Sequence, residues 1–155
     1  MYSNSRLDRA IIKLYNAFNS SNLNPECCKQ CAVGNILDNT DSWKHFSDNH
    51  GSTNLNYIGS VNQRLGKTFN GYTPLELLKI EVIFLTACGY ELPFKHNHLK
   101  PKNPTDTHIL FSALCEVIEF LCDLDNIKNV LDYTNLFKTA TVLKEKKEIN
   151  TKNHT

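Results

Sequence analysis

The sequence has no long hydrophobic run, no excess of charge of one sign and little alternation of apolar with polar residues. Its longest apolar stretch, IEVIFLTACGY, is much shorter than the roughly 20 residues that cross a bilayer as a helix. Charged residues interrupt every apolar run near the N-terminus, which excludes the core of a signal peptide. We therefore expect a cytoplasmic protein with no membrane span.

The charge balance argues against a polyanionic partner. Seventeen Lys and Arg against sixteen Asp and Glu leave a formal charge of +1. Such a chain has no overall field to steer it onto nucleic acid or an anionic membrane. The stretch GKTF, residues 66–69, lacks the upstream glycine and the strand of a phosphate-binding loop. The sequence thus gives no nucleic-acid signal, and a protein partner remains possible but unidentified.

Apolar residues recur at helical spacing along most of the chain, and no internal repeat is present. At 155 residues the chain has the size of one domain with one core. The predicted fold is an all-α, single-domain bundle of five or six helices over residues 1–142. The polar tail, residues 143–155, is expected to fray.

The expected helices follow from capping signals and apolar spacing. Asn24 and Pro25 fit an N-cap followed by proline at the first helical position, which predicts that a helix begins at Pro25. The stretch IKNVLDYTNLFKTATVL predicts a shorter helix or pair near the C-terminus. The remaining segments with helical spacing bring the set of expected helices to residues 5–19, 25–38, 55–66, 74–89 and 103–123, of which the third has a weaker signal.

The clearest helix start is TPLE, in which Thr73 and Glu76 form a capping box around Pro74. The helix that follows is apolar nearly all round, as expected of a central element that other helices cover. Glu81 interrupts its apolar surface and is the best candidate for a buried carboxylate, which would need a raised pKa, a cation or a hydrogen-bond donor. The alternative is a Glu at the margin of a narrow exposed strip.

Three of the six cysteines and two histidines lie together in NPECCKQCAVGNILDNTDSWKHFSDNH, residues 24–50. Cys28, Cys31, His45 and His50 come within one residue of the spacing of a two-Cys, two-His zinc finger. A helix beginning at Pro25 and the lack of a finger's apolar core argue against a finger. A helix can still present Cys28 and Cys31 on one face, with the histidines folding back. We therefore predict a zinc or iron site with these four ligands and Cys27 as an alternative ligand.

Two other interpretations of the same residues stay open. Cys27 and Cys28 would lie in the first turn of the expected helix, where the helix dipole favours the thiolate; Cys31 could resolve it and His45 could act as a base. Alternatively the cysteines only pack in the core, because cysteine is among the most buried residue types. Elsewhere, His96 and His98 fit a solvated loop better than a metal site, and Cys115 and Cys122 are best explained by packing.

Several segments of the chain resemble a family of small proteins from Bacteroidetes, chiefly flavobacteria. They are KLYNAF, CKQCAVGNILDNTDSWKH, LNYIGSV, FNGYTPLELL and the CGY that ends the expected fourth helix. The resemblance extends from about residue 6 to 139. Some members carry the label of one component of a Na+-translocating NADH:quinone reductase. The label implies sites for flavin and NADH and a [2Fe-2S] cluster. This chain, however, has no glycine-rich dinucleotide turn and no ferredoxin-type cysteine run. At most, the resemblance implies an accessory role linked to such a reductase.

Three functions follow from these observations. The first is a small metal-binding or thiol-bearing protein with its site at the second helix. The second is an interaction or accessory module without chemistry. An enzyme that uses a first-turn cysteine is the third and the least supported, so the sequence favours a protein that is not an enzyme and names no catalytic residue.

Overall fold

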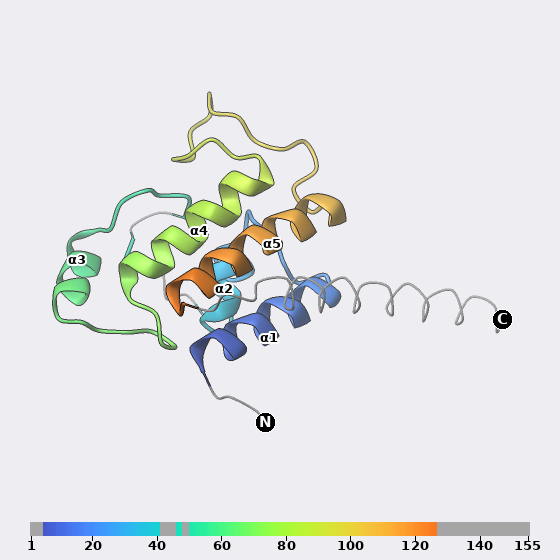
Figure 1. The fold of residues 1–155 in the computed structure, drawn as a ribbon. Helices are drawn as coiled ribbons and strands as arrows, with labels where there is room; N and C mark the ends of the chain where they lie inside the picture. Colours follow the sequence, from blue (N-terminus) through green and yellow to red (C-terminus); the bar gives the residue numbers. More distant parts are fainter. Residues whose placement is uncertain (1–4, 41–45, 48–49, 127–155) are drawn as a thin grey trace.

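The computed structural model describes residues 5–40, 46–47 and 50–126. This part of the chain forms five α-helices and no β-strand, which confirms the predicted all-α class (Figure 1). The helices are α1 (Arg6–Asn19), α2 (Ala32–Ile36), α3 (Tyr57–Arg64), α4 (Pro74–Cys88) and α5 (Thr107–Leu124). The expected C-terminal helix and the polar tail lie outside the described residues. None of the helices in the described ranges is long and apolar enough to cross a membrane.

The caps of the long helices explain where they begin and end. Thr73 and Glu76 form both hydrogen bonds of the predicted capping box at the start of α4. Gly89 ends α4 in the left-handed conformation with φ of 106°, which a glycine adopts without a steric penalty. Asp106 accepts hydrogen bonds from the first amides of α5. The predicted bounds of α4 are thereby confirmed, and α5 begins a few residues later than predicted.

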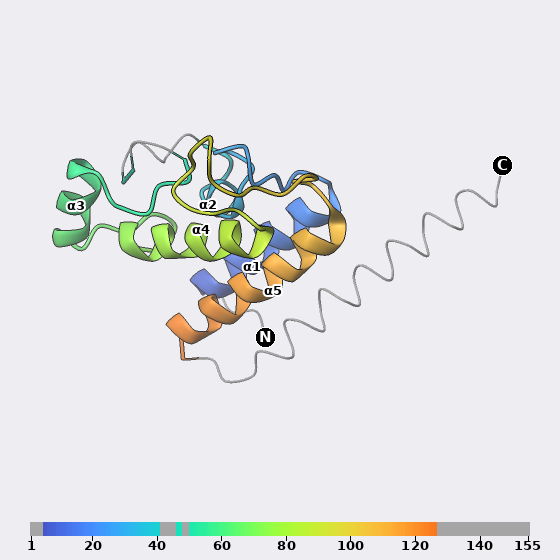
Figure 2. The same cartoon turned by 90° about the horizontal axis from the view of Figure 1, so that it is seen from above.

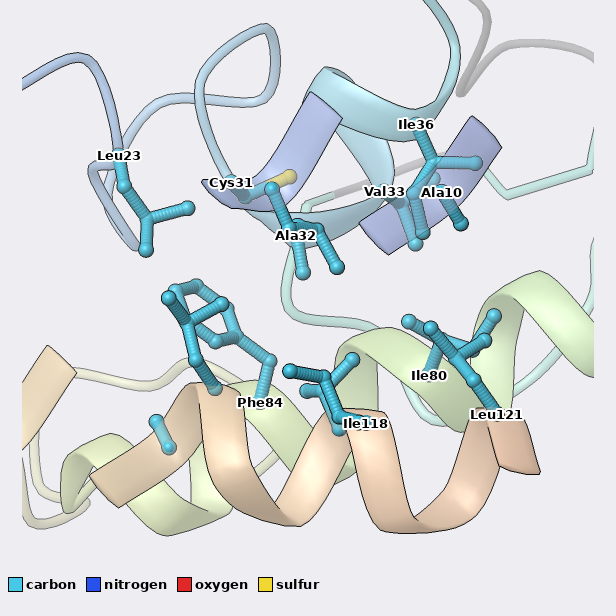
Figure 3. Close-up of a cluster of buried hydrophobic side chains, with 14 of the residues drawn as sticks. Ala10, Leu23, Cys31, Ala32, Val33, Ile36, Ile80, Phe84, Ile118 and Leu121 are labelled. Atoms are coloured by element: carbon cyan, nitrogen blue, oxygen red, sulfur yellow. The ribbon is translucent and has the colours of Figure 1, made fainter. Parts of the chain in front are cut away.

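Helix α4 is the central element: its most extensive contact is with α5, and it also contacts α2 and α3 (Figures 1 and 2). Helix α1 packs against α2 and α5. In Figure 3, Val33 and Ile36 of α2 lie across the core from Ile80 of α4 and Leu121 of α5. All four side chains are buried, and each contributes about 1.5–3 kcal/mol to folding. The short α2 is therefore held by tertiary packing, because five residues are too few for a stable isolated helix.

The prediction of a helix from Pro25 to Asp38 is wrong in its first half. Residues 25–30 form turns, and the helix begins only at Ala32, with Cys31 as its N-cap. The side chain of Asn24 accepts from the amide of Glu26 at 2.9 Å, so the Asn–Pro signal starts a turn and not a helix. The same residue types can begin either a helix or a turn. Packing of the segment against the rest of the protein decides which of the two forms.

A cluster of polar contacts fixes one end of the fold around Arg6. Its guanidinium donates to Asp125 at 2.6 and 2.8 Å, to the Gly71 carbonyl at 2.8 Å and to Glu76 at 3.1 Å. It also lies over the ring of Tyr72, 4.6 Å from the centroid. One side chain thus joins the start of α1, the turn before α4 and the end of α5.

Replacement of Arg6 tests this cluster. Arg6→Ala leaves the carboxylates of Glu76 and Asp125 without their cation, and hydrogen bonds to charged groups are worth about 1.5–3 kcal/mol each, less where they are partly exposed. We expect the free energy of unfolding in urea to fall by about 2 kcal/mol. Arg64→Ala, on the exposed surface of α3, is the matched control and should change it by less than about 0.5 kcal/mol. Equal effects of the two changes would show that the cluster does not stabilise the fold.

Candidate metal centre

Three side chains from separate parts of the chain meet beside α2. The sulfur of Cys31, a ring nitrogen of His50 and a carboxylate oxygen of Glu81 all lie within 4.8 Å of one another. Cys31 is the N-cap of α2, His50 precedes α3 and Glu81 lies in the middle of α4. The fold therefore builds a Cys/His/Glu group that no local sequence spacing defines.

Backbone contacts fix the position of the Cys31 thiol. Its sulfur accepts from the amide of Gly34 at 3.3 Å, and it lies 3.6 Å from the carbonyl oxygen of Cys28, to which the S–H points. A side chain at Gly34 would come within 2.5 Å of the carbonyl carbon of Lys29, so only glycine allows this close approach of the two segments. Cys31 is fully buried, and its sulfur faces inward.

Glu81 is buried, as the sequence suggested, with 1% of its surface exposed. One carboxylate oxygen, Oε1, accepts from the amide of Val33 in the first turn of α2 at 3.0 Å. The other, Oε2, lies 3.5 Å from Nε2 of His50 and has no hydrogen-bond partner among the described residues. A buried carboxylate oxygen in this situation needs a cation or a donor, because loss of hydration otherwise costs several kcal/mol.

Aromatic side chains pack against His50. The imidazole contacts the Phe94 ring edge to face, with centroids 5.4 Å apart, and Phe94 in turn contacts Tyr90 at 5.1 Å. The Phe94 ring lies so close to Gly51 that a Cβ there would be 2.5 Å from it. These contacts leave 15% of the His50 side chain exposed. His50 is thereby held against Glu81 and largely shielded from solvent.

The geometry of the group fits a metal ion of zinc size. Two ligands at the Zn–N and Zn–O distances of about 2.0–2.1 Å in a tetrahedron are about 3.3 Å apart. The observed separation of His50 Nε2 and Glu81 Oε2 is 3.5 Å. A thiolate and a carboxylate together carry two negative charges, which a divalent ion balances. The Cys31 sulfur lies within 4.8 Å of a ring nitrogen of His50 and a carboxylate oxygen of Glu81, so the group has to contract for all three to reach bonding distance.

The structure brings together two of the four predicted ligands, Cys31 and His50. His45 lies outside the described residues, so the four-ligand set as a whole stays a prediction. Cys28 is half-buried and is not in the group of mutually close ligand atoms; its backbone carbonyl contacts the Cys31 thiol instead. Cys27, the alternative ligand, is not in the group either.

Glu81 is the ligand that the sequence did not assign to this site. The available signal was a single carboxylate on an otherwise apolar helix, which indicated burial but not its neighbours. His96 and His98 do not belong to a described cluster of potential ligands: His96 is exposed, and His98 binds the carbonyl of Pro93 at 2.7 Å. They occupy the loop that the sequence predicted for them.

The prediction of a first-turn thiolate is wrong for the observed fold. Cys27 and Cys28 precede α2 by several residues and lie in turns, so neither occupies the first turn of a helix. The dipole of α2 therefore does not act on them as proposed. Cys31, which does cap α2, is fully buried and offers no access to a substrate.

A comparison of the chain with family models, curated proteins and solved structures finds no match. The assignment of the site therefore rests on its own geometry and chemistry.

Thiol labelling of the native protein tests the positions of the cysteines. Burial, and to a smaller extent the charge of Glu81, raises the pKa of Cys88 to about 12, so this thiol stays protonated at mildly alkaline pH. With iodoacetamide at that pH we expect Cys27 and Cys28 to react first, and Cys31 and Cys88 to react only after unfolding. Peptide mass spectrometry gives the order. Labelling of Cys31 as fast as Cys28 would contradict the buried position of the Cys31 sulfur.

Proposed function

We propose that this protein binds one zinc ion through Cys31, His50 and Glu81, and that the ion has a structural role. The observation that carries the proposal is Oε2 of Glu81, a buried carboxylate oxygen 3.5 Å from His50 and without a hydrogen bond in the described part of the chain. A bound cation accounts for a carboxylate in this position, because it replaces the hydration that burial removes.

The ligand types favour zinc over iron. Zinc is bound by thiolate, imidazole and carboxylate in proteins, and one of each is present. Non-haem iron(II) sites instead use two histidines and one carboxylate, and iron–sulfur clusters need several thiolates. A single sulfur beside one nitrogen and one oxygen donor matches neither of these iron sites.

The burial of the site favours a structural role over catalysis. A catalytic zinc keeps an open position that a substrate can reach. Here Cys31 and Glu81 are buried, and His50, in contact with Phe94, is only 15% exposed. A fourth ligand is still needed for a closed tetrahedron, and His45, predicted from the sequence, is the candidate. An ion in this position links α2, the segment before α3, and α4, so its binding energy adds to the stability of the fold.

Metal analysis of the tag-free full chain tests the proposal. We expect about one zinc per chain after purification, and its loss in Cys31→Ser, His50→Ala and Glu81→Gln. Affinity for zinc should fall by more than the roughly 10–100-fold that is typical when a residue hydrogen-bonded to a ligand is replaced. Cys88→Ser, another buried thiol, and His98→Ala, another histidine, are the matched controls and should retain the ion. Plasma mass spectrometry gives the stoichiometry.

Thermal unfolding provides a second readout that separates loss of a ligand from loss of the fold. Zinc at 100 times its dissociation constant stabilises a native protein by about 2.7 kcal/mol. Addition of zinc to the metal-free chain should raise its melting temperature, whereas the three ligand variants should melt cooperatively with no response to zinc. Absence of metal in the purified chain, together with no response to added zinc, would refute the site.

A further inference from the structure

One side of α4 is left uncovered by the rest of the described chain. The helix is apolar nearly all round, which is typical of a helix buried on every side. Its described neighbours are α5, α2 and α3. On the remaining side Val82, Ile83 and Ala87 are only half-buried. The composition of α4 thus indicates a contact that these neighbours do not supply.

These residues form the floor of a groove between α4 and α5. The groove has a volume of about 730 Å³, and Phe120 of α5 completes its apolar floor. Ile83, Ala87 and Phe120 also pack against the buried core, so the floor is part of the rigid framework. A groove between two packed helices is a surface on which a third helix can dock.

The rim of the groove on the α5 side is acidic. Glu116, Glu119 and Asp123 are exposed and line the groove, and their spacing of three and four residues aligns them on one face of α5. They extend over about two turns, or roughly 10 Å. None of the described residues that line the groove is Lys or Arg. The groove therefore combines an apolar floor with a row of negative charge.

We propose that this groove binds an amphipathic helix of a partner protein that carries Lys or Arg beside its apolar face. Apolar side chains at helical spacing would contact Ile83, Ala87 and Phe120, while the basic residues would face the three carboxylates. A second copy of this chain fits less well, because two identical grooves would bring like charges together. The site does not depend on zinc, since Glu81 points from α4 toward α2.

A model peptide tests the groove on the full chain. The probe is a fluorescent amphipathic helix of Leu and Lys, LKKLLKLLKKLLKL, and anisotropy measures its binding. The double variant Glu116→Gln and Glu119→Gln removes two rim charges, and the control Glu26→Gln and Glu91→Gln removes two carboxylates away from the groove. We expect affinity to fall about fivefold or more in the groove variant and less than about twofold in the control.

The apolar floor has its own variant. Ile83→Ser removes a half-buried side chain from the groove and should weaken binding about tenfold, by loss of apolar contact area. Circular dichroism and urea unfolding verify that each variant stays folded. An equal loss of peptide affinity in the groove and control variants would overturn the proposal, because it would show attraction to net charge alone. A lack of peptide binding to the full chain would also overturn it.

Carbodiimide coupling distinguishes the chain's own C-terminal segment from a partner. The reagent joins carboxylates to nearby amines without a spacer. With peptide present, we expect products that link Glu116, Glu119 or Asp123 to peptide lysines. Products that instead link them to Lys138 or Lys144 of the same molecule would show that the chain covers its own groove, and would overturn the proposal of a separate partner.

Discussion

The carboxylate of Glu81 joins the central helix to the start of α2. One oxygen accepts from the Val33 amide at 3.0 Å and the other faces His50 at 3.5 Å. A carboxylate buried to this extent is costly unless each oxygen has a hydrogen-bond donor or a cation beside it. The residues around Glu81 must therefore be held in defined positions. The short α2, the inward sulfur of Cys31 and His50 with the aromatic side chains packed against it all surround this one side chain. A zinc ion would bind Oε2, the carboxylate oxygen that has no hydrogen-bond partner among the described residues.

Packing and a second polar cluster hold the helices around Glu81 in place. Helix α2 has only five residues and depends on packing of Val33 and Ile36 against α4 and α5. The Arg6 cluster holds α1, α4 and α5 together at another place in the fold, through Glu76 and Asp125. The two polar clusters differ in chemistry. The guanidinium of Arg6 is itself the cation between two carboxylates, whereas the neighbours of the Glu81 carboxylate are a histidine and a thiol.

Local signals in the sequence predicted the long helices well. The capping box of Thr73 and Glu76 acts within three residues, so its effect could be inferred without the tertiary fold. The Asn24–Pro25 signal failed because the same pair also starts turns, and packing of α2 decides between the two. The apolar surface of α4 predicted a central helix, but not which side of it the other described helices would leave uncovered.

The Cys/His/Glu group was predictable only in part, for a similar reason. Cysteine and histidine spacing nominated Cys31 and His50, since both belong to one segment of the sequence. Glu81 lies 31 residues beyond His50, and only the packing of α4 against α2 brings it near. Its burial could be suspected from its apolar neighbours along α4, whereas its partners could not.

The proposal that Cys31, His50 and Glu81 hold one zinc ion is tested most directly by the X-ray absorption spectrum of the zinc-loaded protein at the zinc edge, because it counts sulfur and lighter ligands around the ion. A site made of Cys31, His50 and Glu81 gives one sulfur at about 2.3 Å and nitrogen or oxygen neighbours at about 2.0–2.1 Å. Two or more sulfurs would mean that Cys27 or Cys28 has joined Cys31, and no sulfur would exclude Cys31. Either result would contradict the assignment of the ion to these three residues.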